Sequence, residues 1–528
     1  MKHILKFLLI IITFLSFNSC TKLDQKDFSS IPPNSLGGGS GGVDAVFGDA
    51  VGGAYGKLRD FVGNDQWWGV NEACTDECLV PTRGNDWGDG DKWKDLWFHN
   101  FRPSNGDFFT SIWEKSFAGV AACNNVMGDL NKASGPYSTL GTAPSVITLA
   151  QAKAEVRALR AFYYFVLMND FGNVPIIIET TTSTNPSNAT DPADPVNVNN
   201  GQRKLVFQFI ENELAAVLPD LSTKKDNTTY GRMNRWAALA LRAKLYMNAQ
   251  VYTGVPRWAA AQNDCQEVIN SGKYGISSSF ADMFNIKNEG NPEIIFQIPF
   301  DRVWGKGMKM QMMTLHYNSQ GTFRLAGSPW NGFCTTGDFF NTFTTGDKRR
   351  DVTFLSGPAY YPDGSAVKDR GVPFVYKTTV VAFSDPTGNN RNQGARGVKY
   401  YPESFTSDNQ SNDFVFLRLS DIMMMLTEAK LRLGTTDVNF VNQIRERAFG
   451  NNSQAVTPAQ LTLTFLLAER GREFAWEGWR RTDLIRFGKF QDPRPLGAGP
   501  DASLKTNIFP IGVNTLNKNT GLKQNPGY

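Results

Sequence analysis

Apolar side chains recur at steps of three and four residues along the first part of the chain. Over residues 43–62 this spacing places them on one face of a helix, and it recurs over residues 112–130. A third helical stretch, LAQAKAEVRALRAFYYFVLMNDFGNVP at residues 149–175, is stopped by Gly172 and Pro175. The pattern therefore predicts three helices, each with one face turned toward a hydrophobic core.

Two pairs of helical segments follow, and each pair is separated by a short turn. Residues 232–254 and 257–272 form the first pair, and residues 418–434 and 437–450 form the second. Ala-rich faces would let the paired helices pack closely. Helical hairpins of this length resemble tetratricopeptide repeats, although the strict repeat signature is degenerate here.

The character of the chain changes between Tyr274 and Phe416, where Gly, Pro, Asn and aromatic residues are interspersed. Short apolar runs such as EIIFQIPF at residues 293–300 predict isolated strands. We therefore predict a mainly α fold, a tetratricopeptide-like helical-hairpin scaffold with long irregular loop and short-strand excursions, and such loops commonly carry binding residues. The expected parts are a helical scaffold at about 43–273 and 417–490, an irregular ligand-bearing region at about 274–416, and a C-terminal tail at 491–528.

The N-terminal segment MKHILKFLLIIITFLSFNSC has two lysines followed by an apolar run. That run is shorter than the roughly 20 apolar residues that span a bilayer, so it is typical of a signal peptide. Cys20 follows small polar residues, as in a bacterial lipobox. We expect residues 1–19 to be a lipoprotein signal peptide, Cys20 to carry the lipid anchor, and residues 20–42 to be a flexible tether. The alternative is an ordinary secretory signal that ends near a cysteine.

Composition argues against several kinds of partner and site. The formal net charge is +4 and no basic patch stands out, so we expect no nucleic-acid partner. Five cysteines besides Cys20 form a sparse, odd set that does not match a disulfide framework. Neither His99 nor His316 has a partner at metal-ligand spacing, so we expect no cofactor. Calcium at the oxygen-rich segment NDWGDGD, residues 85–91, is the alternative, although the segment departs from EF-hand spacing.

A charged, tryptophan-bearing segment lies near the C-terminal end, at residues 466–485. Taken as one helix, it places Arg470, Glu473, Glu477 and Arg480 on one stripe. Two glutamates one turn apart could suggest a glycoside hydrolase. The neighbouring arginines argue against this, because a guanidinium lowers the pKa of a carboxyl whereas a catalytic acid needs a raised one. We therefore interpret the segment as a structural ion-pair helix.

Several blocks of the sequence resemble one known family. The segments ERGREFAWEGWRRTDLIRFGKF, FPIGVNTLNKNTGLKQNPGY, RLSDIMMMLTEAKLRLG with VNQIRERAFG, and EVRALRAFYYFVLMNDFGNVP occur in the order and setting of the SusD/RagB family. The resemblance covers essentially the whole chain after the signal segment. It implies a non-enzymatic lipoprotein on the outer face of an outer membrane, which captures glycans, or peptides in some branches, for a SusC-like TonB-dependent transporter.

The candidate ligand contacts are aromatic residues with polar neighbours, because a sugar ring stacks its C–H face on an aromatic plane while its hydroxyls need hydrogen-bond partners. Residues 64–100 hold five of the twelve tryptophans, several on a Gly-rich loop. We predict a first site there and a second patch in the irregular region. The first comprises Trp68, Arg83, Asn85, Asp86, Trp87 and Trp93, and the second comprises Trp304, Tyr317, Trp330 and Asn331.

Three alternatives to glycan capture remain open from the sequence. The first is capture of oligopeptides, with aromatic pockets and hydrogen bonds directed at the peptide backbone. The second is a glycoside hydrolase built on Glu473 and Glu477. The third is a lid over the transporter that has negligible ligand affinity of its own. The density of tryptophan favours a sugar ligand over a peptide, but the sequence does not identify the sugar.

Overall fold

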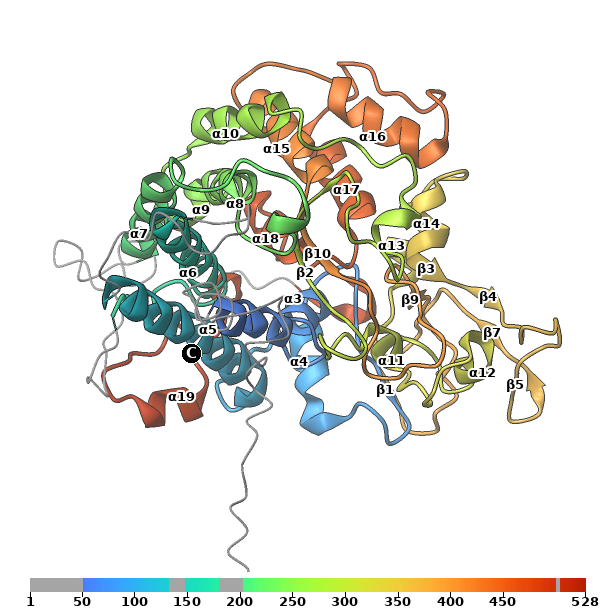
Figure 1. Cartoon of the computed structure of the whole chain (residues 1–528). Coiled ribbons are helices and arrows are strands. Elements are labelled where there is room, and N and C mark those ends of the chain that lie inside the picture. The colour runs from blue at the N-terminus through green and yellow to red at the C-terminus, as the bar shows by residue number, and fades with distance from the viewer. Residues whose placement is uncertain (1–50, 133–147, 180–202, 500–503) are drawn as a thin grey trace, which may run out of the picture.

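The computed structural model describes residues 51–132, 148–179, 203–499 and 504–528. The predicted signal peptide, the lipidation site at Cys20 and the tether lie outside these described residues. Helices crowd one side of the molecule and short strands with irregular loops occupy the other, as Figure 1 shows. The fold is mainly helical, which confirms the predicted class.

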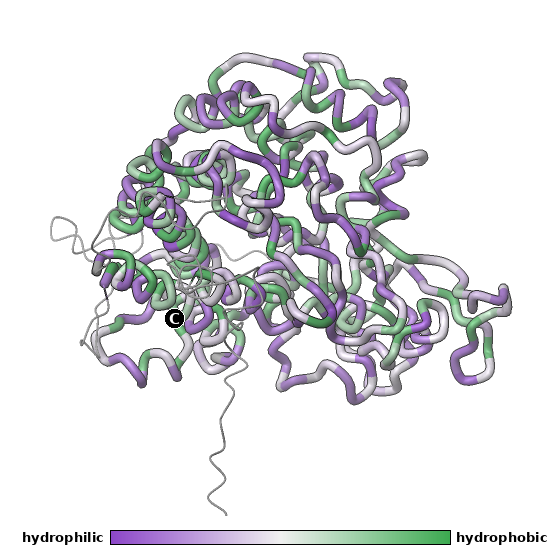
Figure 2. Tube along the Cα trace, viewed as in Figure 1, coloured by the Kyte–Doolittle hydropathy of each residue, from purple (hydrophilic) through white to green (hydrophobic). Residues whose placement is uncertain are grey.

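The long helices form where the apolar period predicts them. Helix α5 (Gly106–Lys132) packs along α6 (Leu149–Phe171), which also packs against α7 (Arg203–Val217). Helix α6 begins at a capping box in which the Thr148 side chain accepts from the backbone N–H of Gln151. Hydrophobic and hydrophilic residues alternate in patches along these helices in Figure 2, as expected of elements with one buried face.

The helical hairpins also form. Helix α8 (Arg235–Met247) is followed by α9 (Ala249–Thr253) and α10 (Trp258–Asn270). Helix α10 lies against both α8 and α15 (Leu419–Arg432), and α15 packs on α16 (Asn439–Phe449). The two predicted helix pairs therefore stack on each other, although they are far apart in the sequence. This stacking is the scaffold that the helical pattern predicts.

One pair of buried strands joins the irregular region to the scaffold. Strand β2 (Ile294–Ile298) pairs antiparallel with β10 (Phe414–Arg418), and both are fully buried. Because β2 precedes the long excursion and β10 ends it, the excursion leaves the scaffold and returns to it at one place.

The remaining strands are two residues long and occur in pairs: β1 (Thr82–Arg83) with β8 (Ser384–Asp385), β3 (Phe354–Leu355) with β9 (Arg396–Gly397), β4 (Gly357–Pro358) with β7 (Val375–Tyr376), and β5 (Lys368–Asp369) with β6 (Val372–Pro373). Further short helices are α3 (Trp67–Ala73), α4 (Lys92–Trp97), α11 (Met310–Thr314), α12 (Ser319–Phe323), α13 (Gly337–Phe340), α14 (Lys348–Thr353) and α19 (Val513–Lys518).

The charged C-terminal segment is not one helix, so that prediction was wrong. Helix α17 (Leu463–Phe474) ends before Trp476, whose φ is +65°, and α18 begins only at Arg480 (Arg480–Arg486). Gly478 follows with φ +84°, and a Cβ there would lie 2.4 Å from the Trp67 ring. Tertiary contacts impose this break, because the N–H of Trp476 donates to Glu77 Oε1 at 2.8 Å.

The two glutamates of this segment are nevertheless ion-paired and buried, with 0% and 2% of their surfaces exposed. Glu473 contacts Arg349, Arg418 and Arg447, and Glu477 contacts Arg418 and Lys399. Burial would raise the pKa of Glu473, but Arg447, Arg418 and Arg349 outweigh it and hold that pKa well below its ordinary value. Both carboxylates are buried in ion pairs, which fits the structural interpretation of the segment better than the hydrolase alternative.

The described ranges bear on two further expectations, one about the membrane and one about metal ions. No helix there is both long and apolar enough to cross a membrane. No three His, Cys, Asp or Glu side chains in those ranges gather closely enough to hold a metal ion. The expectation of no cofactor, with calcium at residues 85–91 as the alternative, stays a prediction.

Candidate functional site

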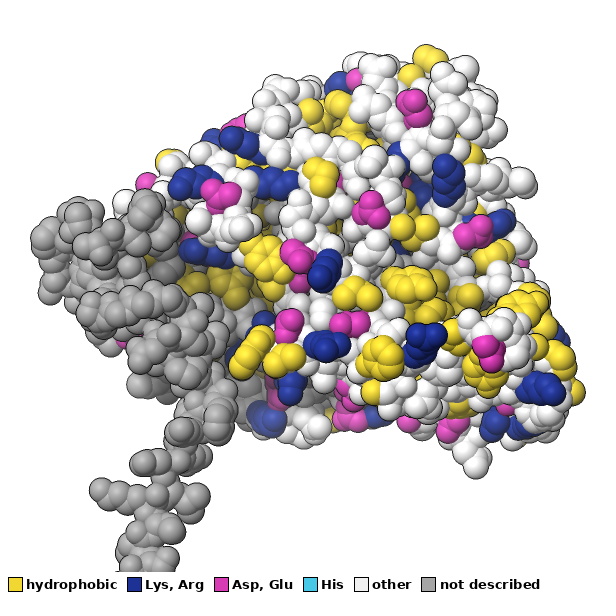
Figure 3. All heavy atoms as spheres, turned by 45° about the vertical axis from the view of Figure 1, so that its right-hand side comes forward, with side chains coloured by type: hydrophobic (Ala, Val, Ile, Leu, Met, Phe, Trp, Pro, Cys, Tyr) yellow, Lys and Arg dark blue, Asp and Glu magenta, His cyan; other side chains and the backbone are white. Residues whose placement is uncertain are grey.

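Exposed apolar side chains concentrate on the irregular region. Nine of the sixteen exposed large hydrophobic residues in the described ranges lie between residues 303 and 405. Figure 3, which turns this side of the molecule forward, shows hydrophobic side chains gathered across the middle and lower right of the face. Patches of this kind mark binding surfaces more often than scattered single residues do. The nine are Val303, Trp304, Tyr360, Tyr361, Val372, Val375, Val381, Tyr401 and Phe405.

A shallow, open hollow of about 680 Å³ lies on this face, and we call it the aromatic hollow. Phe405 is 73% exposed and Tyr361 is 36% exposed, counted over the whole residue. Hydroxyl, amide and cationic groups surround these rings, so the hollow offers both a stacking surface and hydrogen-bond partners. Its lining consists of Tyr317, Asn318, Gln320, Gly321, Arg324, Leu325, Ser328, Tyr361, Lys368 and Phe405.

The backbone holds Phe405 outward. Its φ is +63°, in the left-handed region, and its N–H donates to the carbonyl of Arg324 at 2.8 Å. The hydroxyl of the preceding Ser404 donates to the carbonyl of Phe323 at 2.9 Å. These two hydrogen bonds fix the main chain at residues 404 and 405, and so fix the direction in which the Phe405 side chain leaves the backbone.

A glycine lets Tyr361 lie against helix α12. A Cβ on Gly321 would stand 2.4 Å from the Tyr361 ring, so only glycine at this position permits the contact. The turn that carries the tyrosine is closed by its own N–H, which donates to the carbonyl of Ser365 at 2.8 Å. Tyr361 and Gly321 both line the hollow, and the tyrosine ring lies directly against the helix at the glycine.

Tyr317 connects the hollow to the loop after α3. Its hydroxyl donates to the carboxylate of Asp86, and the Arg391 guanidinium lies 5.6 Å from its ring centre. Burial and then Asp86 raise the pKa of Tyr317 to about 12. The charged residues that line the hollow itself, Arg324 and Lys368, are both cations.

The structure brings together five of the residues that the sequence singled out as two patches. Trp87 Nε1 donates to the carbonyl of Trp330 at 2.7 Å, beside the contact of Tyr317 with Asp86. Asn331 is buried below them, where its amide donates to the Arg391 carbonyl at 3.1 Å and its oxygen accepts from Arg396 at 2.7 Å. The loop and the first part of the irregular region thus form one surface.

Other predicted residues lie inside this surface. Trp68 and Trp93 are buried, and Trp93 packs against Phe108 and Phe333 while its Nε1 donates to Asp89 Oδ2 at 2.7 Å. Burial and the nearby Arg396 lower the pKa of the buried Arg83 to about 9. The faces of these side chains are covered, so in this structure they support the loop and offer no surface to a ligand.

Asn85 is exposed on the same loop. None of the hydrogen bonds described above involves its side chain, so its role as a ligand contact stays a prediction.

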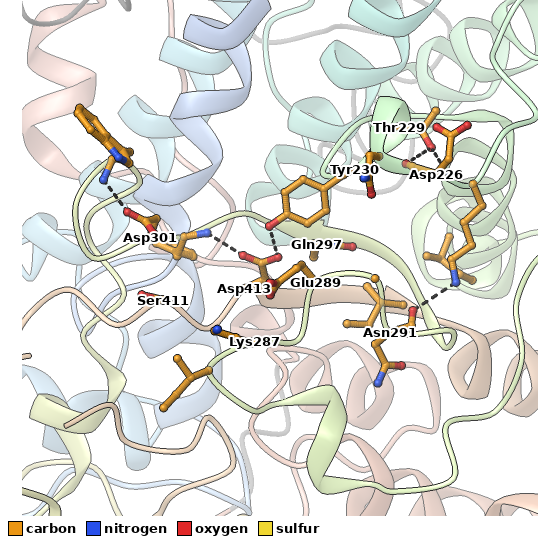
Figure 4. Close-up of a pocket in the computed structure, with 18 of the residues that line it drawn as sticks. Asp226, Thr229, Tyr230, Lys287, Glu289, Asn291, Gln297, Asp301, Ser411 and Asp413 are labelled. Carbon is orange, nitrogen blue, oxygen red and sulfur yellow. Dashed lines mark hydrogen bonds between the residues drawn. The ribbon is translucent and has the colours of Figure 1, made fainter. Parts of the chain in front are cut away.

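Trp304 lies elsewhere, at a cavity of about 880 Å³ that we call the Trp304 cavity. The predicted second patch is therefore divided, because Trp330 belongs with the loop. Figure 4 shows Tyr230 and Asp413 pointing toward each other in this cavity, where the Tyr230 hydroxyl donates to Asp413 Oδ2 at 2.5 Å. Burial raises the pKa of Asp413 to about 6. The lining of the Trp304 cavity also includes Lys225, Asp226, Tyr274, Lys287, Glu289, Asn291, Gln297, Phe300, Asp301, Arg302, Val303, Glu403 and Ser411.

Of the ten residues that line the aromatic hollow, sequence reasoning identified only Tyr317 and missed the other nine, including Tyr361 and Phe405. One local signal could have indicated two of them. Tyr361 precedes the turn residues of YPDGS, and Phe405 is a lone aromatic residue in the polar stretch ESFTSDNQ. An aromatic residue in a polar, turn-rich stretch has no amphipathic element to bury it, so it is a candidate for exposure.

Comparison with known proteins yields two family models that match different parts of the chain. The model described as the SusD family matches residues 292–528. The model described as starch-binding associating with outer membrane matches residues 74–247. Together they span both the helical scaffold and the irregular region.

Individual relatives agree with these models. The starch-binding protein SusD of Bacteroides thetaiotaomicron is 27% identical over 438 residues, covering 72% of this chain and 73% of the relative. Among solved structures, surface glycan-binding protein A of the same organism in complex with laminarihexaose has a TM-score of 0.70 at 21% identity, with 91% and 99% of the two chains covered. A SusD superfamily protein from Parabacteroides distasonis has a TM-score of 0.72 at 19% identity, covering 92% and 99%. The two structural matches establish the fold alone.

Proposed function

Because the chain belongs to the SusD/RagB family, we propose that it binds a glycan at the aromatic hollow and delivers it to a SusC-like TonB-dependent transporter. The observation that carries the proposal is the pair of exposed rings, Phe405 and Tyr361, in one hollow with hydrogen-bonding side chains. Starch is the ligand named for the curated relative and laminarihexaose the one bound in a structural neighbour, and both are glycans.

The chemistry of the hollow suits a sugar. Phe405 and Tyr361 offer flat apolar faces for the C–H side of a pyranose ring. Asn318 and Gln320 carry amides that both donate and accept, which matches hydroxyl groups. Arg324 and Lys368 add donors whose positive charge would also favour an acidic sugar. We infer a binding protein rather than an enzyme, because no acid–base pair faces this hollow.

We also infer how the protein is held at the membrane. A lipidated Cys20 followed by the tether of residues 20–42 would anchor the domain to the outer membrane, facing the cell exterior. One acyl chain gives only marginal binding, so several chains on Cys20 would be needed for a firm anchor. The description of the matching family model, which names association with the outer membrane, supports this location.

Native gels containing single polysaccharides test the proposal. The chain from residue 21 onward would be run through starch, laminarin and a panel of neutral and acidic polymers, beside Phe405→Ala and Tyr361→Ala. Val255→Ala is the matched control, because Val255 is an exposed residue on the turn between α9 and α10, outside both cavities. We expect at least one polymer to retard the wild type and the control, and to retard either hollow variant much less.

Other outcomes lead elsewhere. Retardation that survives both substitutions would move the site away from the hollow. Absence of retardation in every polymer would contradict glycan capture, and titration with an oligopeptide library would then test the peptide alternative. A chain that binds neither class, yet copurifies with its transporter, would be a lid.

A further inference from the structure

We propose that the Trp304 cavity is a second carbohydrate-binding site, separate from the aromatic hollow, with Trp304 as its stacking platform. The inference rests on the proposed glycan binding and adds a site, a ligand class and a set of residues to it. Three observations carry it: the exposure of Trp304, the rigidity of the turn that presents it, and the composition of the cavity beside it.

Trp304 is an exception among the tryptophans. All twelve lie in the described ranges; eleven are buried or half-buried, whereas the surface of Trp304 is 89% exposed. A tryptophan side chain can bury about 150–250 Å² of surface, so leaving one in water forgoes a large hydrophobic gain. Exposure of this size therefore indicates a residue whose partner is another molecule.

The turn around Trp304 is held rigidly. Asp301 Oδ1 accepts from the N–H of Val303 at 2.7 Å and from the N–H of Trp304 at 2.8 Å. The backbones of Asp301 and Gly305 exchange two hydrogen bonds, at 2.9 and 3.1 Å. A Cβ on Gly305 would lie 2.8 Å from the Asp301 nitrogen, so the closure requires glycine. The hydrogen bonds that the carboxylate accepts from the N–H groups of Trp304 and Val303 hold the pKa of Asp301 below its ordinary value.

The cavity beside the turn combines an aromatic wall with groups of both hydrogen-bonding kinds. Tyr230 is fixed by its hydrogen bond to Asp413, which also accepts from the N–H of Phe300 at 2.9 Å. Lys287 and Glu289 also line this cavity, so its lining offers a donor and an acceptor. A sugar hydroxyl donates and accepts, and it can use both.

The charges of the cavity indicate which sugars it takes. Five carboxylates line it, from Asp226, Glu289, Asp301, Glu403 and Asp413, against three cations, from Lys225, Lys287 and Arg302. Burial lowers the pKa of Lys225 to about 8 and raises the pKa of Asp413 to about 6, so both groups are mainly charged at about pH 7 and the excess of carboxylates remains. An excess of carboxylates repels uronate or sulfate groups, so the ligand class is a neutral glycan. The aromatic hollow has the opposite charge on its lining.

The two sites flank the same stretch of chain. Glu403 lines the Trp304 cavity and Phe405 lines the aromatic hollow. Glu403 and Phe405 are two positions apart in the chain, so their Cα atoms are at most about 7 Å apart. The stretch is fixed by the Glu403 carboxylate, which accepts from the N–H of Ser411 at 2.7 Å. One long glycan chain can therefore contact both sites, and binding at one raises the effective concentration at the other.

The test compares four variants with a polymer and with a short oligosaccharide of the same glycan, using the polysaccharide that retards the wild type. Trp304→Ala is set beside Trp304→Phe, which keeps a flat ring, and beside Val255→Ala as the matched exposed control. Phe405→Ala represents the hollow. In calorimetry we expect the oligosaccharide to bind two sites per chain in the wild type and in Val255→Ala. We expect it to bind one site per chain in Trp304→Ala and in Phe405→Ala. Affinity for the polymer should fall about tenfold in Trp304→Ala, a loss of about 1.4 kcal/mol, and by less in Trp304→Phe.

Outcomes against the inference differ from outcomes against the proposed function. If no glycan binds the wild type, the proposed function fails and this inference fails with it. If glycan binds the wild type and Trp304→Ala equally, in number of sites and in affinity, only the second site is refuted. Loss of copurification with the transporter in Trp304→Ala, with unchanged glycan binding, would likewise overturn it and would assign Trp304 to a protein contact.

Discussion

The hydroxyl of Tyr317 donates a hydrogen bond to the carboxylate of Asp86, 231 residues earlier in the chain. This contact ties the loop after α3 to the wall of the aromatic hollow. Trp87 makes a second tie close by, from its Nε1 to the carbonyl of Trp330. The loop itself does not line the hollow, but these two ties hold the segment of Tyr317 and Trp330 against it, so they connect the packing of the loop to the position of the Tyr317 wall.

Removal of the Tyr317–Asp86 contact should weaken glycan binding without unfolding the protein. Asp86→Ala and Tyr317→Phe each delete one partner, and we expect either change to reduce affinity about three- to tenfold. Because Asp86 is exposed, the free energy of unfolding should change by less than about 0.5 kcal/mol in Asp86→Ala. Affinity is measured in gels and calorimetry, and unfolding in urea. The double variant should lose no more affinity than either single variant, whereas fully additive losses would show that the two residues act independently.

The close contact of Gly321 with Tyr361 leads to a prediction about a lining residue that has no side chain to offer a ligand. In Gly321→Ala the new methyl group would lie 2.4 Å from the tyrosine ring, so the contact between helix and ring cannot persist unchanged. We expect a loss of glycan affinity similar to that of Tyr361→Ala. Gly128→Ala is the control, because a Cβ there meets nothing within 4 Å and alanine should stabilise helix α5 by about 0.5–1 kcal/mol. Unchanged affinity in Gly321→Ala would mean that the position of Tyr361 does not matter for binding.

Local periodicity predicted the scaffold, because an amphipathic helix such as α6 is specified by its own residues and by caps such as Thr148. It failed at the break between α17 and α18, where Trp476 takes φ +65° through a contact with Glu77, 399 residues earlier. The site shows the same limit. Residue type singled out Asp86, Tyr317 and Trp304, but exposure is a tertiary property, so Trp93 proved to be buried and Phe405 and Tyr361 were missed.

The buried position of Glu473 predicts a structural role rather than catalysis. Glu473→Gln removes a charge that Arg349, Arg418 and Arg447 share, and it leaves those guanidinium groups incompletely paired. We expect a destabilisation of about 3–5 kcal/mol in urea unfolding. Glu114→Gln, which breaks the exposed pair with Lys518, should lose no more than about 1 kcal/mol. Release of reducing ends from a polysaccharide by the wild type, abolished in Glu477→Gln, would instead restore the hydrolase alternative.

The buried carboxylate of Glu469 predicts how stability depends on pH. Burial would raise its pKa, but Arg349, Arg472 and Arg445 outweigh this and lower the pKa from 4.5 to about 2. The unfolded chain therefore binds a proton at a higher pH than the folded one, so the stabilisation is complete above about pH 5 and is lost as pH falls toward 2. That contribution is worth about 3 kcal/mol. The urea midpoint of the wild type should fall between pH 5 and pH 3, and Glu469→Gln should start lower and fall less over the same range. Parallel decreases in both proteins would assign the acid sensitivity to other carboxylates.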